Sequence, residues 1–369
     1  MSDLATRAKL TPPDAQLPVH VYFDEALLAR ETAQLFQCGP RYVGHALMVP
    51  NVGDFATLAS EHAGRMLVRN KEGAQGITVL SNVCRHRQAL MCNGRGNASH
   101  IVCPLHRWTY DLQGQLIGAP HFPETPALHL ATTPLQQWNG LLFEQNGYNV
   151  MDKLAQLSVA RDLDFSDYMF DHVEVQTCNY NWKTFIEVYL EDYHVEPFHP
   201  GLGGFVSCDD LRWEFGRDYS VQTVGVNHGL LKAGSPTYRK WQEQVLKFRG
   251  GTPPPYGAIW LTLYPNIMVE WYPHVLIVST LFPDGPQQTR NVVEFYYPEE
   301  IVLFERAFIE AERAAYMETC VEDDEIALRM DAGRRALLRR GVSETGPYQS
   351  PMEDGMQHFH AWYRANLPL

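Results

Sequence analysis

The sequence predicts an α+β fold, in which a small all-β domain precedes a larger domain whose antiparallel sheet curls around one long C-terminal helix. Residues 41–150 are short apolar runs separated by Gly- and Asn-rich turns, the pattern of short β-strands. Residues 258–298 contain three longer strand candidates, and residues 298–340 then repeat apolar side chains at helical spacing. Strands followed by one long packing helix are typical of an α+β domain.

Length and composition agree with an ordinary globular protein. The chain has 369 residues, enough for two domains, with 45% hydrophobic and 20% charged residues. The net charge of -13 leaves no basic face for nucleic acid or for an anionic membrane. Residues 1–18 lack the apolar core of a signal peptide, and no run of about 18 apolar residues occurs. We therefore expect a cytoplasmic protein, where cysteines at metal-ligand spacing indicate metal binding rather than disulfides.

The individual elements follow from local patterns. Residues 1–40 combine a Pro-rich start with a helix from Asp24 to Phe36, and residues 172–182 are strand-like. A helix is expected over 182–195, ended by Pro197. The polar, Gly- and Pro-rich segment 228–255 predicts a surface loop or lid. The long helix after residue 298 carries one apolar stripe, formed by Ile301, Phe304, Phe308, Ala311 and Ala315.

The first metal motif is Cys84-x-His86 followed by Cys103-x-x-His106. Two cysteines on one iron and two histidines on the other form the ligand set of a Rieske-type [2Fe–2S] cluster. A structural Cys₂His₂ zinc site is less consistent, because zinc fingers group Cys with Cys and His with His. Cys92, between the two halves, is interpreted as a small packed residue rather than a competing ligand.

A second metal motif lies in the expected helix over 182–195. Glu187, Glu191 and His194 are spaced i, i+4 and i+7, so a helix would place them on one face. After Pro197 the chain can fold back and bring His199 beside His194. Two histidines and one carboxylate form the facial triad of non-haem Fe(II) oxygenases. The carboxylate is expected from the long C-terminal helix, which offers Glu322, Asp323, Asp324 and Glu325.

Together, the two motifs resemble those of the α subunit of a Rieske non-haem iron ring-hydroxylating oxygenase, over nearly the whole chain. The family pattern E-x3-[DE]-x2-H-x4-H falls on Glu187, Glu191, His194 and His199. This resemblance implies that His194 and His199 bind iron and that Glu191 is a bridging carboxylate, with Glu187 also assigned to the catalytic segment. The family's third ligand is an Asp two residues before a Glu. That selects Asp323, with Asp324 as the alternative.

The resemblance also implies an architecture. Residues 1–40 would form a helical segment packing on the catalytic domain, residues 41–150 the Rieske domain, and residues 151–369 a helix-grip (START-like) catalytic domain that holds mononuclear Fe(II). The α subunits of the family associate head to tail as homotrimers, so that Glu191 would link His194 to a cluster histidine of the neighbouring subunit. Gln88 departs from the family, since glycine commonly stands there, and Leu105 and Val188 replace a frequent Tyr and a frequent Asn.

The resemblance predicts a terminal oxygenase of a two-component system. An NAD(P)H-dependent flavin or iron–sulfur reductase would supply electrons, and O2 would be used to hydroxylate or oxidatively cleave a small organic substrate. Glu191 and the segment 350–364 resemble the carnitine and glycine-betaine monooxygenase branch, which favours a quaternary ammonium compound. The alternative is a ring-hydroxylating dioxygenase acting on a benzoate-like acid. Candidate substrate-pocket residues are Phe205, Trp260, Tyr264, Asn266 and Trp271, with Met268 and Tyr272 on the same strands.

Two further classes of protein remain to be distinguished from an oxygenase. A pure electron-transfer Rieske protein would lack the mononuclear iron, and a non-catalytic helix-grip binding protein would lack the second histidine pair. The pair His194 and His199 argues against both.

Overall fold

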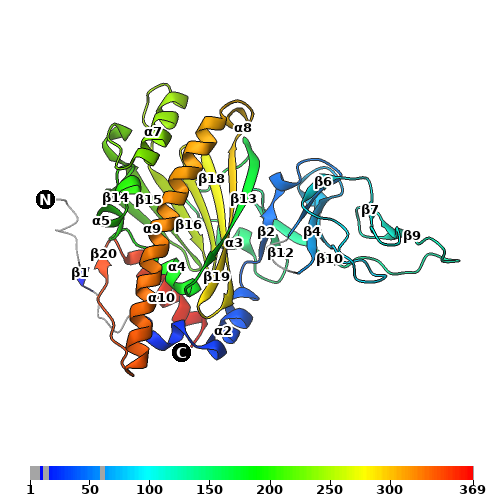
Figure 1. Ribbon diagram of the computed structural model, residues 1–369, viewed down its shortest axis with the longest axis horizontal. Coiled ribbons are helices and arrows are strands. Elements are labelled where there is room, and N and C mark those ends of the chain that lie inside the picture. Colours follow the sequence, from blue (N-terminus) through cyan, green and yellow to red (C-terminus); the bar gives the residue numbers. More distant parts are fainter. Residues whose placement is uncertain (1–8, 11–15, 59–62, 369) are drawn as a thin grey trace. The chain divides into compact units, whose positions relative to one another are not determined.

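The computed structural model describes residues 9–10, 16–58 and 63–368, and the chain divides into two compact units (Figure 1). One unit spans residues 40–156. The other combines the described part of residues 1–39 with residues 157–368. Within the described residues, no helix combines the length and the apolar character needed to cross a membrane.

The unit of residues 40–156 is built from three small antiparallel sheets, which confirms the predicted all-β domain. A five-stranded sheet has the order β10-β5-β4-β3-β6, and two three-stranded sheets have the orders β11-β12-β2 and β7-β8-β9. A short helix, α3 (Val150–Lys153), closes the unit. The strands are β2 (Tyr42–His45), β3 (Asp54–Thr57), β4 (Arg65–Arg69), β5 (Ile77–Ser81), β6 (Arg95–Asn97), β7 (Ile101–Val102), β8 (Thr109–Tyr110), β9 (Leu116–Gly118), β10 (Thr132–Thr133), β11 (Leu135–Trp138) and β12 (Leu141–Glu144).

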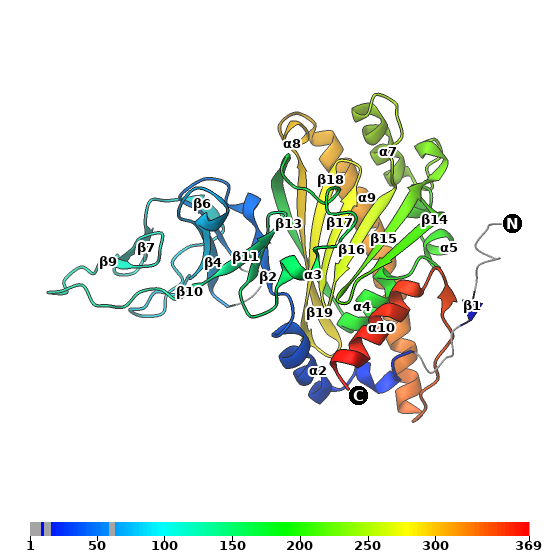
Figure 2. The same ribbon diagram turned by 180° about the vertical axis from the view of Figure 1, so that it is seen from behind.

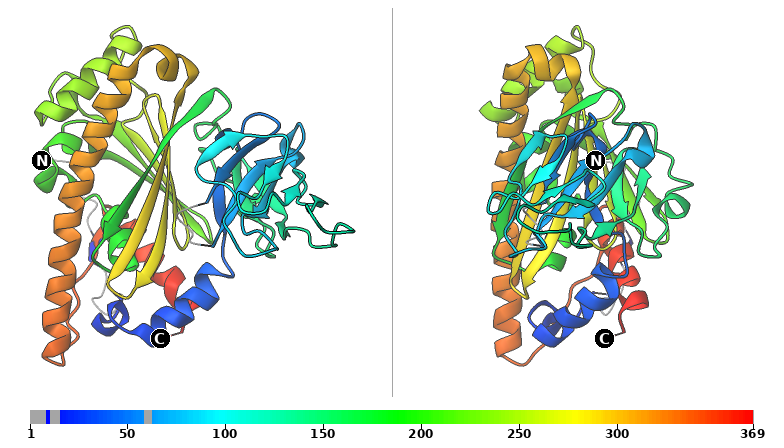
Figure 3. Two further views of the ribbon diagram at one scale, coloured as in Figure 1. Left: turned by 45° about the vertical axis from the view of Figure 1, so that its right-hand side comes forward. Right: turned by 90° about the vertical axis from the view of Figure 1, so that its right-hand side faces the viewer.

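The larger unit is a seven-stranded antiparallel sheet with one long helix across it, as predicted (Figures 1 and 3). The strand order is β13-β19-β18-β17-β16-β15-β14. Apolar residues of helix α9 (Arg306–Arg339), including Phe308 and Ala315, pack with Phe295 and Tyr297 of the sheet in one buried core. The strands are β13 (Tyr168–Cys178), β14 (Val206–Phe215), β15 (Tyr219–Val226), β16 (Ala258–Leu263), β17 (Ile267–Tyr272), β18 (Val275–Gly285) and β19 (Gln288–Pro298).

Two of the predicted elements are each divided in the structure. Residues 258–273 form the hairpin β16–β17 rather than one strand, with the turn at Tyr264–Asn266. The helical stretch after residue 298 is α8 (Glu299–Phe304) and α9, separated at Glu305, whose φ of -123° is not helical. The break rotates Phe304 out of the predicted apolar stripe, so that this side chain is 77% exposed while Phe308 is buried.

The predicted helix over 182–195 is wrong in its second half. Helix α4 (Trp182–Tyr189) stops before Glu191, and α5 (Val195–Phe198) and α6 (Pro200–Gly203) follow. The Glu191 carboxylate accepts a hydrogen bond of 3.1 Å from the backbone N–H of His194, and such local side-chain bonds compete with helix continuation. Pro197 does not end the helix; it lies within the first turn of α5, where proline is tolerated.

The segment 228–255 is not a long loop, because its centre forms helix α7 (Pro236–Phe248). Ser235 caps the helix, with its Oγ accepting from the N–H of Tyr238 at 3.1 Å, and Pro236 occupies the first position. The buried side chains Tyr238, Trp241, Gln242 and Val245 recur at i, i+3, i+4 and i+7. These four buried residues are outnumbered by exposed polar residues in the segment, and composition alone therefore predicted a loop.

The described N-terminal residues and the C-terminal helix pack together against α4. The 3₁₀ turn η2 (Val19–Tyr22), α2 (Glu25–Glu31) and the π-helical turn η3 (Thr32–Phe36) precede the first unit, and β1 (Lys9–Leu10) pairs with β20 (Gln349–Ser350). Residues from η2 and α2 share an apolar core with α4 and α10 (Asp354–Asn366), seen at the lower edge of the sheet in Figure 2. Buried Lys183 pairs with Glu31 at 2.6 Å within this core.

Candidate functional site

The four predicted cluster ligands lie on two loops of matching backbone geometry. In the first loop the N–H of Cys84 donates to the carbonyl of Ala89 at 2.9 Å, and the N–H of Gln88 donates to the carbonyl of Cys84 at 3.1 Å. In the second loop the N–H of Cys103 donates to the carbonyl of Trp108 at 2.8 Å, and the N–H of Arg107 donates to the carbonyl of Cys103 at 3.1 Å. Each loop therefore presents one cysteine and one histidine from the same kind of turn.

The side chains around these loops suit a cluster with two cysteines on one side and two histidines on the other. Cys84 and Cys103 are 1% and 2% exposed, while the rings of His86 and His106 lie edge to face, with centroids 4.7 Å apart. The His86 ring stacks on Trp108 at 4.9 Å, and its Nδ1 is buried without a hydrogen-bond partner. A buried nitrogen free of other bonds is available to ligate iron.

The backbone conformation at Gln88 accounts for the glycine that the family resemblance predicts at this position. Its φ is 55°, in the left-handed region that glycine adopts without steric cost, and Arg107 at the matching place of the second loop has a φ of 62°. Both turns thus require a conformation that an L-residue accepts only with strain. Cys92, by contrast, is held through its backbone, because the Asn82 side chain bonds both its N–H and its carbonyl.

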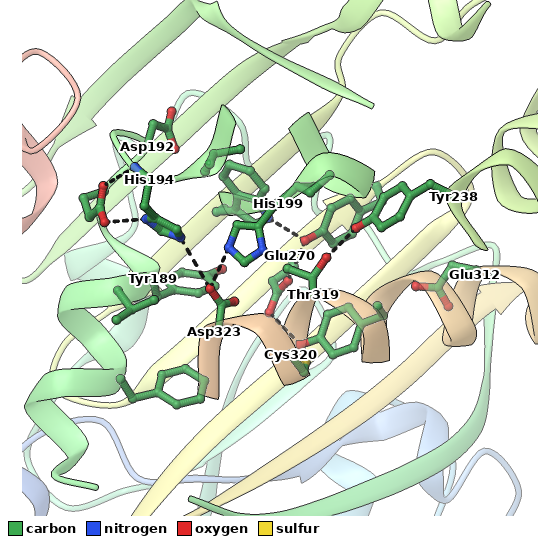
Figure 4. Close-up of a pocket in the computed structure, with 18 of the residues that line it drawn as sticks. Tyr189, Asp192, His194, His199, Tyr238, Glu270, Glu312, Thr319, Cys320 and Asp323 are labelled. Atoms are coloured by element: carbon green, nitrogen blue, oxygen red, sulfur yellow. Dashed lines mark hydrogen bonds and ion pairs between the residues drawn. The ribbon is translucent and has the colours of Figure 1, made fainter. Parts of the chain in front are cut away.

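His194, His199 and Asp323 form the second centre (Figure 4). One ligand atom from each lies within 4.8 Å of the others. Asp323 Oδ1 is 2.9 Å from His199 Nε2 and 3.4 Å from His194 Nε2. Both Asp323 Oδ1 and His199 Nε2 are buried without an aligned hydrogen bond. Atoms that converge on one point without bonding each other fit a bound metal ion, and two histidines with one carboxylate fit non-haem iron.

Each histidine of this centre is oriented by a carboxylate on its other ring nitrogen. His194 Nδ1 bonds Glu191, and His199 Nδ1 bonds Glu322 at 2.7 Å. Such outer bonds leave Nε2 free for the metal and fix the ring. Although burial opposes it, Asp323 and Glu191 raise the pKa of His194 to about 10, so metal binding would displace a proton. Glu322 was one of several acidic candidates, and the sequence did not indicate this role.

The structure distinguishes Asp323 from its neighbour. Asp324 points elsewhere and accepts a hydrogen bond of 2.6 Å from the Tyr180 hydroxyl. Neighbouring residues on a helix are about 100° apart around the axis, so only one of the two can face the histidines. The geometry thus selects Asp323 and leaves Asp324 outside the centre.

Glu187 does not reach the metal centre, contrary to the expectation from its helical spacing. Its buried carboxylate bonds Tyr22, Arg334 and His360, the last at 2.8 Å. Although burial opposes it, Arg334 and His360 lower the pKa of Glu187 to about 2, so it is an ionised anchor. Because α4 ends at Tyr189, before Glu191, the two glutamates do not share one helix face.

A cavity opens beside the metal centre, between α9 and the sheet (Figure 4). Aromatic side chains form much of its wall, and α7 contributes two of them. No lysine or arginine is among the described lining residues. The lining comes from α4 (Phe185, Val188, Tyr189), α7 (Tyr238, Trp241), β16 and β17 (Trp260, Glu270, Tyr272) and α9 (Glu312, Tyr316, Thr319, Cys320, Asp323), with Glu191, Asp192, His194, Val195 and His199 from the segment between α4 and α6 and Leu202 from α6.

Three carboxylates of this cavity are almost fully buried: Asp192, Glu270 and Glu312 are 2%, 2% and 1% exposed. Burial raises the pKa of Glu270 and of Glu312 to about 8. One oxygen of Asp192 and one of Glu312 have no hydrogen-bond partner. A buried carboxylate without a partner is costly, so these groups are either protonated or open to a hydrogen-bond donor from the cavity.

Of the predicted substrate residues, the cavity includes Trp260 and Tyr272. Phe205 lies under α7, stacked on Trp241 at 4.2 Å, and Tyr264 bonds His358 of α10. Asn266 donates to the carbonyl of Leu281 at 2.7 Å. Trp271 is on the opposite face of β17 from Glu270 and Tyr272, because successive strand residues alternate. The sequence analysis did not identify Glu270 as a cavity residue. The signal that could have found it is that Glu270 is a single acidic residue in an otherwise apolar strand.

Comparison with known proteins agrees with both centres. Residues 42–135 match the Rieske [2Fe-2S] domain, and residues 158–368 match the catalytic domain of the ring hydroxylating alpha subunit. The chain is 71% identical to putrescine 2-hydroxylase of Ralstonia nicotianae, over 99% of both chains, and 57% identical to putrescine 2-hydroxylase of Bordetella bronchiseptica, over 99% of this chain and 87% of that one. The fold is similar to that of the quaternary ammonium Rieske monooxygenase CntA, with a TM-score of 0.75, 20% identity, and coverage of 98% of this chain and 100% of the other.

Proposed function

The chain belongs to the α subunits of Rieske non-haem iron ring-hydroxylating oxygenases, and we propose that it hydroxylates putrescine at carbon 2. It is an oxidoreductase with a [2Fe–2S] cluster and a mononuclear iron. The observation that carries the substrate proposal is the cavity beside His194, His199 and Asp323, which combines aromatic walls with buried carboxylates. The likeness to putrescine 2-hydroxylase supports it.

A primary diamine matches the chemistry of this cavity. An alkylammonium group is cationic and donates three hydrogen bonds, so it can satisfy a buried carboxylate such as Glu312. Its methylene chain suits the aromatic walls. A benzoate-like acid, the alternative from the sequence, would place an anion among Glu270, Glu312 and Asp323 without a compensating lysine or arginine in the described lining.

A quaternary ammonium compound is the second candidate, favoured by the aromatic wall formed by Tyr189, Trp260 and Tyr272. Aromatic faces bind such cations without hydrogen bonds. A quaternary nitrogen has no N–H group, however, and would leave the buried carboxylate oxygens without a donor. The carboxylates therefore favour the primary amine.

His194, His199 and Asp323 would hold the iron, which when bound activates O2 for insertion into a C–H bond. The overall conversion takes C–H, O2, two electrons and two protons to C–OH and water. The protein residues hold and orient: Glu191 and Glu322 fix the two imidazoles, and the aromatic wall keeps water from the reacting carbon.

Electron supply completes the proposal. We assign to Glu191 the bridge between His194 and a cluster histidine (His86 or His106) of a neighbouring subunit, in a head-to-tail homotrimer that closes into a ring. An NAD(P)H-dependent flavin or iron–sulfur reductase in the cytoplasm would deliver electrons singly to the cluster.

The test is turnover of the purified, iron-loaded chain with a reductase and NADH. With putrescine it should consume NADH and O2 and give a product heavier by one oxygen atom that derives from ¹⁸O2. Carnitine and choline should be poorer by about 100-fold or more in kcat/KM, because their quaternary nitrogens have no N–H group to donate to the buried carboxylates. Efficient turnover of carnitine with none of putrescine would transfer the proposal to the quaternary amines.

A further inference from the structure

Five positions of α9 face the cavity along one stripe: Glu312, Tyr316, Thr319, Cys320 and Asp323. With a rise of about 1.5 Å per residue, Glu312 lies about 16 Å along the helix axis from Asp323. Figure 4 shows Glu270 beside Asp323 and Glu312 farther along the helix. The cavity therefore has an end at the metal ligands and a far end at Glu312.

Glu312 at the far end has a free acceptor. Its Oε2 accepts a hydrogen bond of 2.5 Å from the Tyr297 hydroxyl, whereas Oε1 is buried and has no partner. The side chain is 1% exposed, and no lysine or arginine lines the cavity within the described part of the chain. A buried carboxylate oxygen without a donor is costly, and this one faces the cavity.

Glu270 at the near end is only loosely held. Its two oxygens accept long hydrogen bonds from the hydroxyls of Tyr272, at 3.2 Å, and Tyr316, at 3.3 Å. A carboxylate has about four acceptor positions, so Glu270 retains capacity for a further donor. Its neighbours Trp260 and Tyr272, bonded to each other at 2.8 Å, provide aromatic surface beside it.

Building on the proposed function, we propose that Glu270 and Glu312 bind the two ammonium groups of an aliphatic diamine, Glu270 the group nearer the metal ligands and Glu312 the distal one. An extended four-carbon diamine spans about 6 Å between its nitrogens. Laid along α9, it would bring the first carbons of the chain, next to the ammonium group at Glu270, nearest to His194, His199 and Asp323. Glu312 would then favour substrates that carry a second ammonium group and whose carbon chain has the right length to reach it.

Proton release gives a second signature of this binding mode. Burial raises the pKa of the Glu312 carboxyl, at the far end from the metal ligands, to about 8, so it is largely protonated at pH 7 in the absence of a cation. An arriving ammonium group favours the ionised carboxylate. Binding of the distal ammonium group at pH 7 therefore releases up to about one proton from Glu312 to the buffer.

The test is calorimetric titration of the oxidised, anaerobic holoenzyme, in which putrescine binds without turnover. Wild type should bind putrescine at least about tenfold more tightly than butan-1-amine or propane-1,3-diamine. Glu312→Gln should weaken putrescine binding about 30-fold, or about 2 kcal/mol at 1.4 kcal/mol per tenfold, and should weaken butan-1-amine less. Titrations in buffers of different ionisation enthalpy should show about one proton fewer released by this variant.

Glu294→Gln is the matched control, since Glu294 is also buried and accepts from a tyrosine, Tyr296, at 2.6 Å, but does not line the cavity. It should bind putrescine as wild type does. If wild type binds putrescine tightly and Glu312→Gln binds it equally well, Glu312 is not a subsite, although the proposed function stands. If wild type fails to bind putrescine, the proposed function itself is wrong. Equal affinity of wild type for putrescine and butan-1-amine overturns the two-ended mode without any variant.

Discussion

The cluster loops and the iron centre are built in different ways. The four cluster ligands lie within residues 84–106, on two loops closed by the same pair of local backbone hydrogen bonds. The proposed iron centre would take its ligands from the segment between α4 and α6 and from α9, and the cavity beside it adds residues of α7, β16 and β17. A metal site made of local turns can be predicted from a short stretch of sequence. A substrate cavity depends on which face of each element points into it, and these elements are far apart in the sequence.

The two centres also differ in how their histidines are supported. The His86 ring stacks on Trp108, and Nδ1 of that ring has no hydrogen-bond partner. His194 and His199 each bond a carboxylate, Glu191 and Glu322. Orientation in the first case depends on packing, and in the second on charge-assisted hydrogen bonds. The iron centre is therefore the one in which a single carboxylate substitution should have the larger effect.

The largest expected effect separates the two centres. Asp323→Ala removes the only carboxylate oxygen that converges with both Nε2 atoms, among the residues that the structure describes. Iron content should fall from about three to about two atoms per chain, with the visible spectrum of the cluster unchanged and turnover lost. Iron quantitation and absorption spectra measure this.

Asp324→Ala is the control for that experiment, because it changes the adjacent carboxylate, which bonds Tyr180 instead. It should keep the iron and the activity. Loss of iron from Asp324→Ala with retention in Asp323→Ala would reverse the assignment of the third ligand.

The structure brings together the residues predicted as ligands but places most of the predicted pocket residues elsewhere, for a physical reason. Cys84, His86, Cys103 and His106 follow from spacing, because each pair needs only one turn. His199 and Asp323 came from a motif and an acidic run, and the choice between Asp323 and Asp324 needed the helix rotation that the structure supplies. The spacing that placed Glu187 with Glu191 assumed a continuous helix, which ends at Tyr189.

The prediction of the cavity residues failed where tertiary packing determines which side chains line the cavity. Tyr264 and Asn266 look like strand aromatics and polar neighbours in sequence, but they form the turn between β16 and β17. Tyr238 and Trp241 were hidden in a segment that composition assigned to a loop. Glu312 is one of many acidic residues of α9, and only the burial of its stripe against the sheet separates it from the exposed ones.

A second, smaller effect separates orientation of a ligand from electron delivery. Glu191→Ala and Glu322→Ala each remove the carboxylate that bonds the Nδ1 of one iron ligand. Loss of this support should weaken iron binding about 10- to 100-fold in both. If Glu191 is also the bridge, iron-saturated Glu191→Ala should keep a reducible cluster yet oxidise it far more slowly in the presence of putrescine and O2 than iron-saturated Glu322→Ala does. Stopped-flow absorbance of the cluster measures the rates, and equal rates would leave Glu191 with orientation alone.

The smallest expected effect tests whether the geometry of the cluster loops depends only on their local backbone conformation. Gln88 has a positive φ of 55°, which costs an L-residue about 1 kcal/mol or more, so Gln88→Gly should raise the stability of the all-β unit by about 0.5–1 kcal/mol. Arg85, exposed in the same loop, does not have a positive φ, and Arg85→Gly should lower stability by about as much, because glycine adds freedom to the unfolded chain. Denaturation monitored by the visible absorption of the cluster measures both. Opposite signs mean that the backbone of the turn, and not its side chains, sets the geometry of the cysteines. The same sign for both variants would mean that contacts of the Gln88 side chain hold the loop.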